Sequence, residues 1–217
     1  MEQLDAELCM VAAHIGEPGQ PSAVLALVRQ VEGRGRDSQG KWPTRTYVVS
    51  SSVFDGMVAY DQVLTRIADV FNEKRFQQAP RRHAVVSVGA QDFARDLRRR
   101  GVSSLTQVAM SDARTVTSGT VATVVGKVAL VGALMRAVQR DELKVVVEVE
   151  DAPGLLDAMR TLSVKAPRLE HEDPPEDPRI LALQVAAWKQ ETMSVRLPGE
   201  SGADVAPMHD PFAREER

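Results

Sequence analysis

The sequence has one cysteine, few aromatic residues and no long apolar run. A single cysteine, Cys9, excludes a disulfide within the chain and a cysteine-rich zinc site, and it suits a reducing compartment. Two Tyr, two Trp and five Phe are too few to alternate with basic residues, as surfaces that bind single-stranded nucleic acid require. The longest apolar stretches have the length of a strand, so we expect no membrane-spanning helix.

Signals for export and for nucleotide binding are also missing. The N-terminus, MEQLDAEL, carries acids where a signal peptide carries a basic region and an apolar block, so we expect a soluble protein that is not secreted. No GxxxxGK[ST] phosphate loop is present. The net charge of −3 gives no global attraction to nucleic acid, so any such binding must rest on local basic clusters.

The first third of the chain has three strand-like runs separated by turn residues. The runs are Leu8–Ile15, Ser22–Val31 and Thr44–Phe54. GEPGQP and a polar, glycine-rich stretch over 33–43 separate them, which predicts a three-stranded antiparallel meander. From Met57 the apolar spacing becomes helical, and this helix should end before Pro80.

The central stretch, from Arg81 to Gly101, organises the rest of the prediction. Ala84–Val86 is a continuous apolar run of the kind found in parallel strands that are covered on both faces. Ser87 follows it, at the strand end where α/β sheets bind ligands. A helix over 91–100 and a strand over 105–110 then predict a right-handed crossover to a parallel neighbour.

The second half is mainly helical. After a polar loop over 111–123, a helix carries an apolar stripe that we expect in the core: Val128, Val131, Leu134, Met135 and Val138. Lys144–Val149 predicts an edge strand that could pair with another copy of the chain. Helices are expected from Asp151 and over 179–192, separated by an acidic, proline-rich loop. We therefore predict one domain over 1–192 and a polar tail over 193–217.

The order of elements resembles the ribonuclease H-like fold, an α/β fold with a mixed five-stranded sheet in which an antiparallel meander continues into parallel strands flanked by helices. Within that superfamily the chain resembles the C-terminal nuclease domain of phage large terminases, over roughly residues 8–192. Where that family has an aspartate before a glycine and then Asp-Pro-Thr-Ala, this sequence has His14-Ile15-Gly16 and Gln20-Pro21-Ser22-Ala23. Where the family's second aspartate ends the central strand, this sequence has Ser87-Val88-Gly89.

Two further blocks carry the resemblance. A lysine opens the family's next helix after a Val-Pro-Lys-like turn, and here the turn is Val125-Gly126-Lys127. The family has His-Asp-Asp before its last helix, and here the sequence is Glu176-Asp177-Pro178. Because no phosphate loop is present, the resemblance implies a nuclease-like domain without the motor ATPase half.

The matching positions predict a degenerate active site at His14, Ser87, Asp177 and Pro178. Two-metal cleavage of a phosphodiester needs several carboxylates to hold two divalent ions about 4 Å apart. Each missing unit of ligand charge forfeits on the order of 4 kcal/mol at an effective dielectric near 20. We therefore expect no catalytic residue, no bound metal and no cofactor, with Mg²⁺ or Mn²⁺ only if the site has been rebuilt.

Three alternatives remain open from the sequence. An active nuclease could hold manganese or zinc at a rebuilt site that uses His14, Glu17, Asp92 and Asp177. Ser87 could act as a nucleophile, although Gly89 does not complete a GxSxG elbow. A virion assembly protein that binds no DNA would need none of this chemistry.

Basic side chains around the central strand could contact the phosphates of double-stranded DNA. Part of this charge has a structural explanation, because the last turn of a helix favours cations. The resemblance implies a structural or binding component of a phage or prophage particle, located in a bacterial cytoplasm or a virion, with phage proteins and DNA as partners and no membrane. The candidate DNA contacts are Arg81, Arg82, Arg98, Arg99, Arg100 and Lys127.

Overall fold

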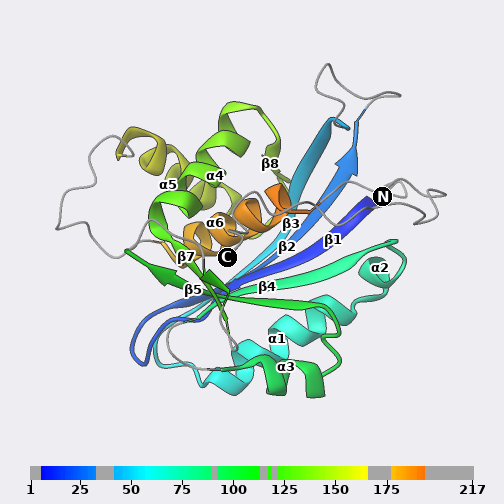
Figure 1. Ribbon diagram of the computed structural model, residues 1–217, viewed down its shortest axis with the longest axis vertical. Helices are drawn as coiled ribbons and strands as arrows, with labels where there is room; N and C mark the ends of the chain where they lie inside the picture. Colours follow the sequence, from blue (N-terminus) through cyan, green and yellow to red (C-terminus); the bar gives the residue numbers. More distant parts are fainter. Residues whose placement is uncertain are drawn as a thin grey trace, which may run out of the picture.

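A mixed β-sheet runs through the middle of the molecule with helices on both faces (Figure 1). A computed structural model describes residues 6–32, 42–88, 92–112, 117–118, 122–165 and 177–193. In these residues eight strands form one sheet in the order β6-β7-β5-β4-β1-β2-β3-β8. The strands are β1 (Ala6–His14), β2 (Ser22–Val31), β3 (Thr44–Phe54), β4 (Arg82–Val88), β5 (Leu105–Ser111), β6 (Thr117–Ser118), β7 (Thr123–Gly126) and β8 (Leu143–Val145).

The predicted meander is confirmed. β1 pairs with β2 and β2 with β3, both antiparallel. The first eight residues of β2 are all buried, because helices cover both faces of the sheet at this point. β4 then adds to the other side of β1 as a parallel strand, and β5 continues in parallel beside β4. This central order, β3-β2-β1-β4-β5, is the ribonuclease H-like arrangement that the sequence predicts.

The helices form two layers. On one face lie α1 (Tyr60–Asn72), the short α2 (Lys74–Gln77) and α3 (Ala94–Arg99). On the other lie α4 (Lys127–Gln139), α5 (Ala152–Lys165) and α6 (Pro178–Glu191). Alternate residues of β1 and β4 point into separate cores, one under α1 and α3 and one under α4 and α6. No helix within the described ranges is long and apolar enough to cross a membrane.

The structure confirms the expected core stripe of α4 in part, because Leu134 is fully buried and Val138 packs against the core. Val128 is 54% exposed, whereas Leu130 and Ala133, which lie outside the predicted stripe, are fully buried. The buried face is therefore rotated from the predicted one, and the reason is that α6 packs beside α4 as well as the sheet lying beneath it. The apolar residues of α4 are distributed around most of its circumference, so their periodicity alone did not identify the face that contacts the sheet.

Several boundaries also differ from the sequence prediction. β6 forms within the loop expected over 111–123, and β7 forms where the sequence analysis expected the end of that loop and a turn. β7 pairs with β5 in parallel. β8 ends at Val145 because the chain turns there, with the Val149 amide donating to the Val146 carbonyl at 3.1 Å. α3 starts three residues later than expected, since the Asp92 side chain accepts a hydrogen bond from the Ala94 amide at 2.9 Å. Residues 33–41 of the predicted hairpin loop, 166–176 of the acidic loop and 194–217 of the predicted tail lie outside the described residues.

Candidate functional site

β1 and β4 are parallel neighbours that end side by side, and this brings together two of the predicted site residues. His14 is the last residue of β1 and pairs in register with Ser87 of β4. The His14 Nδ1 lies 3.3 Å from the Ser87 Oγ, in hydrogen-bond contact. The Ile15 amide donates to the Ser87 carbonyl at 2.9 Å, which holds the two strand ends together.

Both side chains of this pair are uncharged at neutral pH. Burial lowers the pKa of His14 to about 4, because the interior disfavours the imidazolium form. Ser87 is fully buried, so a substrate could reach its hydroxyl only if the surrounding residues moved. A neutral imidazole and a hydroxyl, packed against each other, supply no negative charge for a divalent cation.

The start of α6 faces the same edge of the sheet. At the far end of the helix, the Gln190 side chain accepts a hydrogen bond from Thr46 at 2.8 Å, and its carbonyl accepts from Arg29 at 3.4 Å. Arg29 pairs with Leu8 near the beginning of β1, so α6 ends where β1 begins. Since α6 packs along β1, β2 and β4 and is about 21 Å long at ~1.5 Å per residue, its first turn lies toward the edge where β1 and β4 end.

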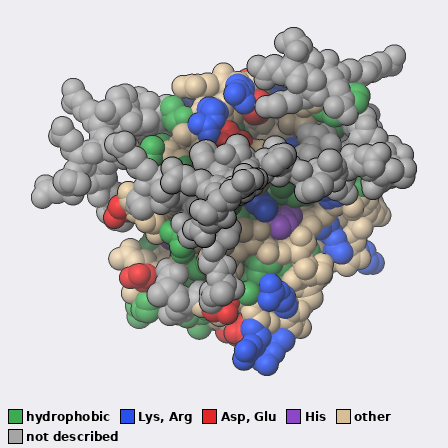
Figure 2. All heavy atoms as spheres, in the orientation of Figure 1, with side chains coloured by type: hydrophobic (Ala, Val, Ile, Leu, Met, Phe, Trp, Pro, Cys, Tyr) green, Lys and Arg blue, Asp and Glu red, His purple; other side chains and the backbone are tan. Residues whose placement is uncertain are grey.

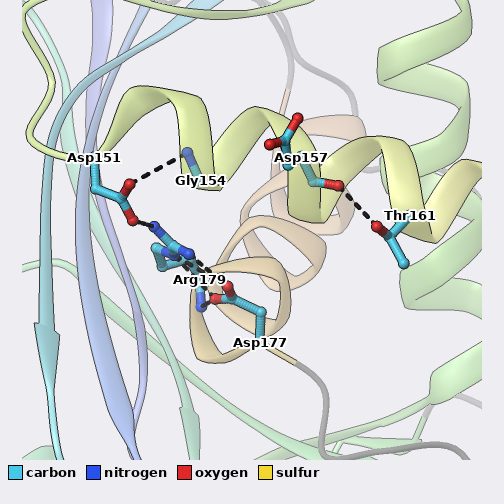
Figure 3. A network of polar contacts seen from close by, with 6 residues as sticks. All are labelled: Asp151, Gly154, Asp157, Thr161, Asp177 and Arg179. Atoms are coloured by element: carbon cyan, nitrogen blue, oxygen red, sulfur yellow. Dashed lines mark hydrogen bonds and ion pairs between the residues drawn. The ribbon is translucent and has the colours of Figure 1, made fainter.

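Asp177 stands at this first turn, where it is engaged by Arg179 (Figure 3). Its Oδ1 caps the helix by accepting from the Arg179 amide at 2.8 Å. The Arg179 guanidinium donates to both carboxylate oxygens, from Nε at 3.0 Å to Oδ1 and from Nη2 at 2.6 Å to Oδ2. The third nitrogen, Nη1, donates to Asp151 Oδ2 at 2.6 Å, so one guanidinium joins two carboxylates.

This arrangement keeps Asp177 ionised and already paired. Burial acts to raise the pKa of Asp177, but the hydrogen bonds from Arg179 outweigh it and hold the pKa below its ordinary value. The same bonds raise the pKa of Arg179, which is only 11% exposed. A cation that approached Asp177 would have to displace a charged guanidinium from a half-buried position.

Pro178 is buried in the first turn of α6. Proline is favoured there because its missing amide would have no partner in the helix and its ring fixes the helical φ angle. Its side chain cannot bind a metal. The position therefore contributes to the start of the helix.

The remaining candidate ligands are Glu17 and Asp92. Glu17 is exposed in the turn between β1 and β2. Asp92 accepts from the Ala94 amide and, at 3.1 Å, from the Gln107 side chain. Over the described residues, no three His, Cys, Asp or Glu side chains gather where they could hold a metal ion. His14, Glu17, Asp92 and Asp177 all lie within the described residues.

The donors therefore do not fit a pair of divalent ions. The three matching positions offer an imidazole, a buried hydroxyl and one carboxylate that Arg179 already neutralises. Two close divalent ions need several hard anionic oxygens between and around them.

The candidate DNA contacts fall on two edges of the molecule. Lys127 lies at the start of α4, at the edge where the parallel strands end, and pairs with Asp112 at 3.0 Å. The arginines lie at the other edge: Arg81 pairs with buried Glu7 at 2.7 Å, and Arg82 lies over the Phe71 ring. Figure 2 shows Lys and Arg side chains gathered where Figure 1 places α2 and α3. In α3, Arg99 lies 3.7 Å from Asp96, and Arg100, which follows the helix, pairs with Asp61.

The sequence analysis did not identify two residues in and near the candidate site, Arg179 and Gln107. Arg179 is the partner of Asp177, and a signal for it exists: a cation in the first turn of a helix opposes the helix dipole and so requires a nearby acid. Gln107 is buried on β5 and accepts from the Phe93 amide at 2.9 Å, which fixes the segment after β4. Nothing in the sequence marks Gln107, because its partner lies 14 residues away across the crossover.

Comparison with solved structures finds nuclease domains of terminases. The chain is similar to the large terminase nuclease of the thermophilic phage G20c, with a TM-score of 0.47, 14% identity, and coverage of 84% of this chain and 82% of that chain. It is also similar to the nuclease domain of the bacteriophage SPP1 large terminase, with a TM-score of 0.43, 13% identity, and 85% of each chain covered. The human cytomegalovirus terminase nuclease domain gives a TM-score of 0.45, 12% identity, and 82% of each chain covered.

No protein-family model and no curated protein sequence matches the chain. At 12–14% identity the likeness to the terminase nuclease domains concerns the fold alone. The roles of individual residues therefore rest on the geometry described above.

Proposed function

We propose that this chain is a catalytically inactive domain with a terminase-nuclease-like fold. It acts as a structural or binding component of a phage or prophage particle, or of the machinery that packages its DNA. The observation that carries the proposal is the bond between Arg179 and Asp177, with Nη2 and Oδ2 2.6 Å apart. The one acid at the three degenerate positions is already neutralised from within the same helix.

The electrostatics of the strand ends support the same reading. His14 and Ser87 are neutral, and the interior around them lowers the pKa of His14 because it disfavours charge. A nuclease site of this fold would need the opposite environment, in which anionic oxygens converge and attract cations. The fold then remains available for contacts with other proteins or DNA, since the sheet and helices do not depend on a metal.

Calorimetric titration of the purified protein with Mn²⁺ tests the proposal. We expect no saturable heat at millimolar Mn²⁺, and the same flat trace for the D177N variant. Stoichiometric binding by the wild-type protein that is abolished in D177N would contradict the proposal. That result would instead support the active nuclease with a rebuilt site.

A further inference from the structure

A basic surface lies at the edge of the sheet opposite the His14–Ser87 pair. We define it by five residues of α2, the start of β4 and the end of α3: Lys74, Arg75, Arg82, Arg98 and Arg99. Along β4, Arg82 and Ser87 are five residues apart, about 17 Å at ~3.3 Å per residue. The basic surface is therefore separate from the candidate site.

Direct contacts hold the parts of the basic surface together. Asn72, the last residue of α1, donates from its side chain to the Arg100 carbonyl at 3.2 Å, and its backbone carbonyl accepts from the Gln77 side chain at 2.9 Å. Arg82 donates to the Phe71 carbonyl at 3.4 Å. The end of α1 is thus the common neighbour of α2, β4 and α3, and the three segments expose their cations around it.

The charge at this surface is not balanced by local acids. Residues 69–100 hold eight Lys and Arg against four Asp and Glu, although the whole chain has more acids than bases. In the described part of the chain, no ion pair joins Lys74, Arg82 or Arg98 to a carboxylate, whereas Arg75 pairs with Glu73. The helix dipole explains cations in the last turn of α3, but it does not explain Lys74 or Arg82.

Two of the guanidinium groups are held in place by aromatic rings. Arg82 lies 5.0 Å from the centre of the Phe71 ring, and Arg75 lies 4.8 Å from that of Phe76. Such contacts restrict a long side chain while leaving its nitrogen atoms available as donors. Both rings are buried, with Phe71 2% and Phe76 3% exposed.

The composition of the surface distinguishes between classes of partner. Single-stranded nucleic acid requires exposed aromatic rings for stacking, and Phe71 and Phe76 are covered. A protein partner needs apolar anchors at the centre of its interface. The large apolar side chains exposed in the described residues all lie on other elements: Val53, Met57, Val128, Val147 and Leu156.

From these observations we infer that the basic surface binds the phosphate backbone of double-stranded DNA without reading its sequence. Phosphate contacts require exposed cations and no apolar anchors, and the basic surface has cations on α2, β4 and α3 without a large exposed apolar side chain among them. This inference names a partner for the domain proposed above, and it rests on that proposal only for the biological setting. The binding itself does not depend on whether the domain cuts DNA.

Fluorescence anisotropy with a labelled 30-base-pair duplex of mixed sequence tests the inference. If the three cations without an ion pair in the described residues, Lys74, Arg82 and Arg98, each contact one phosphate, the slope of log affinity against log salt should be about −3, at roughly −0.9 per contact. The K74E/R98E variant should bind at least about tenfold more weakly at low salt, with a slope smaller by about 2. Both side chains are exposed and make no ion pair within the described ranges, so the variant should fold, which circular dichroism checks.

The matched control is R140E/R160E, which changes the net charge equally but on the opposite helical layer. Both of those arginines are well exposed, at 59% and 78%. The inference predicts that the control loses little affinity and that a single strand of the same sequence or a polyglutamate peptide binds much more weakly than the duplex. Equal losses in both variants, or equal binding of either competitor, would overturn it.

A parallel plasmid-cleavage assay separates this inference from the proposed function. If the wild-type protein neither binds the duplex in a salt-dependent way nor cleaves the plasmid, only the inferred DNA binding is overturned. Metal-dependent cleavage by a protein whose duplex binding depends on Lys74 and Arg98 would overturn only the inactive reading.

Discussion

Arg179 binds Asp177 through two nitrogen atoms and both carboxylate oxygens, within the first turn of one helix. The guanidinium carries the positive charge that a metal ion would otherwise supply, and it does so permanently because arginine does not lose its proton. The contact therefore supports the start of α6 and occupies the acid at the same time. Asp151 binds the same guanidinium, so Arg179 also links the start of α6 to the start of α5 (Figure 3).

Replacing Arg179 with glutamine should destabilise the fold by about 1–3 kcal/mol, because it removes charge-assisted hydrogen bonds from a largely buried site. Urea unfolding at neutral pH measures the change. The control is R160Q, since Arg160 and Asp157 form an ion pair whose side chains are 78% and 72% exposed. That variant should lose less than about 0.5 kcal/mol, and equal losses in the two variants would contradict the importance of the Arg179 pair.

The pH dependence of the same variant gives a second readout. The folded-state pKa of Asp177 lies below its ordinary value of 3.8, so the unfolded state takes up a proton first as the pH falls. This stabilisation is present above that value and is lost as the pH falls through the lowered pKa. We expect R179Q to lose less stability than the wild type over this acidic range.

The lowered pKa of His14 should make the free energy of unfolding decrease between neutral and mildly acidic pH. Its folded pKa is about 4, against 6.5 as the ordinary value, so the unfolded state binds a proton first as the pH falls. The stabilisation is complete above pH 6.5 and decreases until about pH 4, by about 3 kcal/mol in total. Unfolding measured across this range should show a shallower dependence in H14Q.

Nuclear magnetic resonance isolates His14 from His83, whose pKa burial also lowers to about 4. The ring signals of His14 should stay unchanged from pH 7 to about 5 and shift only near pH 4. A His14 midpoint near 6.5 would show that the ring is solvated, which would contradict the neutral pair with Ser87.

Glu7 and Arg29 form a buried ion pair at the other end of β1, with side chains only 2% and 4% exposed. Replacing Glu7 with glutamine leaves the Arg29 charge without its partner in the core, so we expect a loss of about 3–5 kcal/mol. The control is E73Q, whose partner Arg75 is 42% exposed and which should cost less than about 1 kcal/mol. Thermal and urea unfolding measure both, and a mild effect of E7Q would show that water reaches the pair.

Restoring carboxylates at the degenerate positions should restore metal binding. In H14D/S87D/P178D the acids repel one another within a buried site, so the variant should be less stable than the wild type without metal. Millimolar Mn²⁺ should then raise its melting temperature through preferential binding to the folded state. Adding R179Q should increase that shift, because the guanidinium no longer competes for Asp177.

The control for this series is the wild-type protein, whose melting temperature Mn²⁺ should leave unchanged. Should the folded variants melt at the same temperature with and without Mn²⁺, the three positions do not face one common site. That outcome would contradict the placement of Asp177 toward the ends of β1 and β4.

The central strands could be predicted from the sequence because burial on both faces leaves continuous apolar runs. β2 and β3 have the predicted boundaries, and β1 and β4 differ by a few residues. β7 was missed because its short run, Thr123–Gly126, follows a Ser- and Thr-rich segment and becomes a strand only by pairing with β5. The buried face of α4 was predicted only in part, with Leu134 correct and Val128 wrong, because α6 and the sheet both contact that helix.

The candidate site was predictable only in part. His14 and Ser87 could be placed at strand ends, and the parallel register brings them into contact. The ion pair between Arg179 and Asp151 could not be found by spacing alone, since Asp151 lies 28 residues before Arg179. Which carboxylates are free to bind a cation depends on such long-range contacts, and these appear only in the folded chain.

Incubation of the purified protein with supercoiled plasmid and Mn²⁺ tests the absence of catalysis most directly. The account predicts that the plasmid stays supercoiled at all protein concentrations, for the wild type and for D177N alike. Nicking that requires the divalent ion and disappears in D177N would show an active metal site and contradict the account.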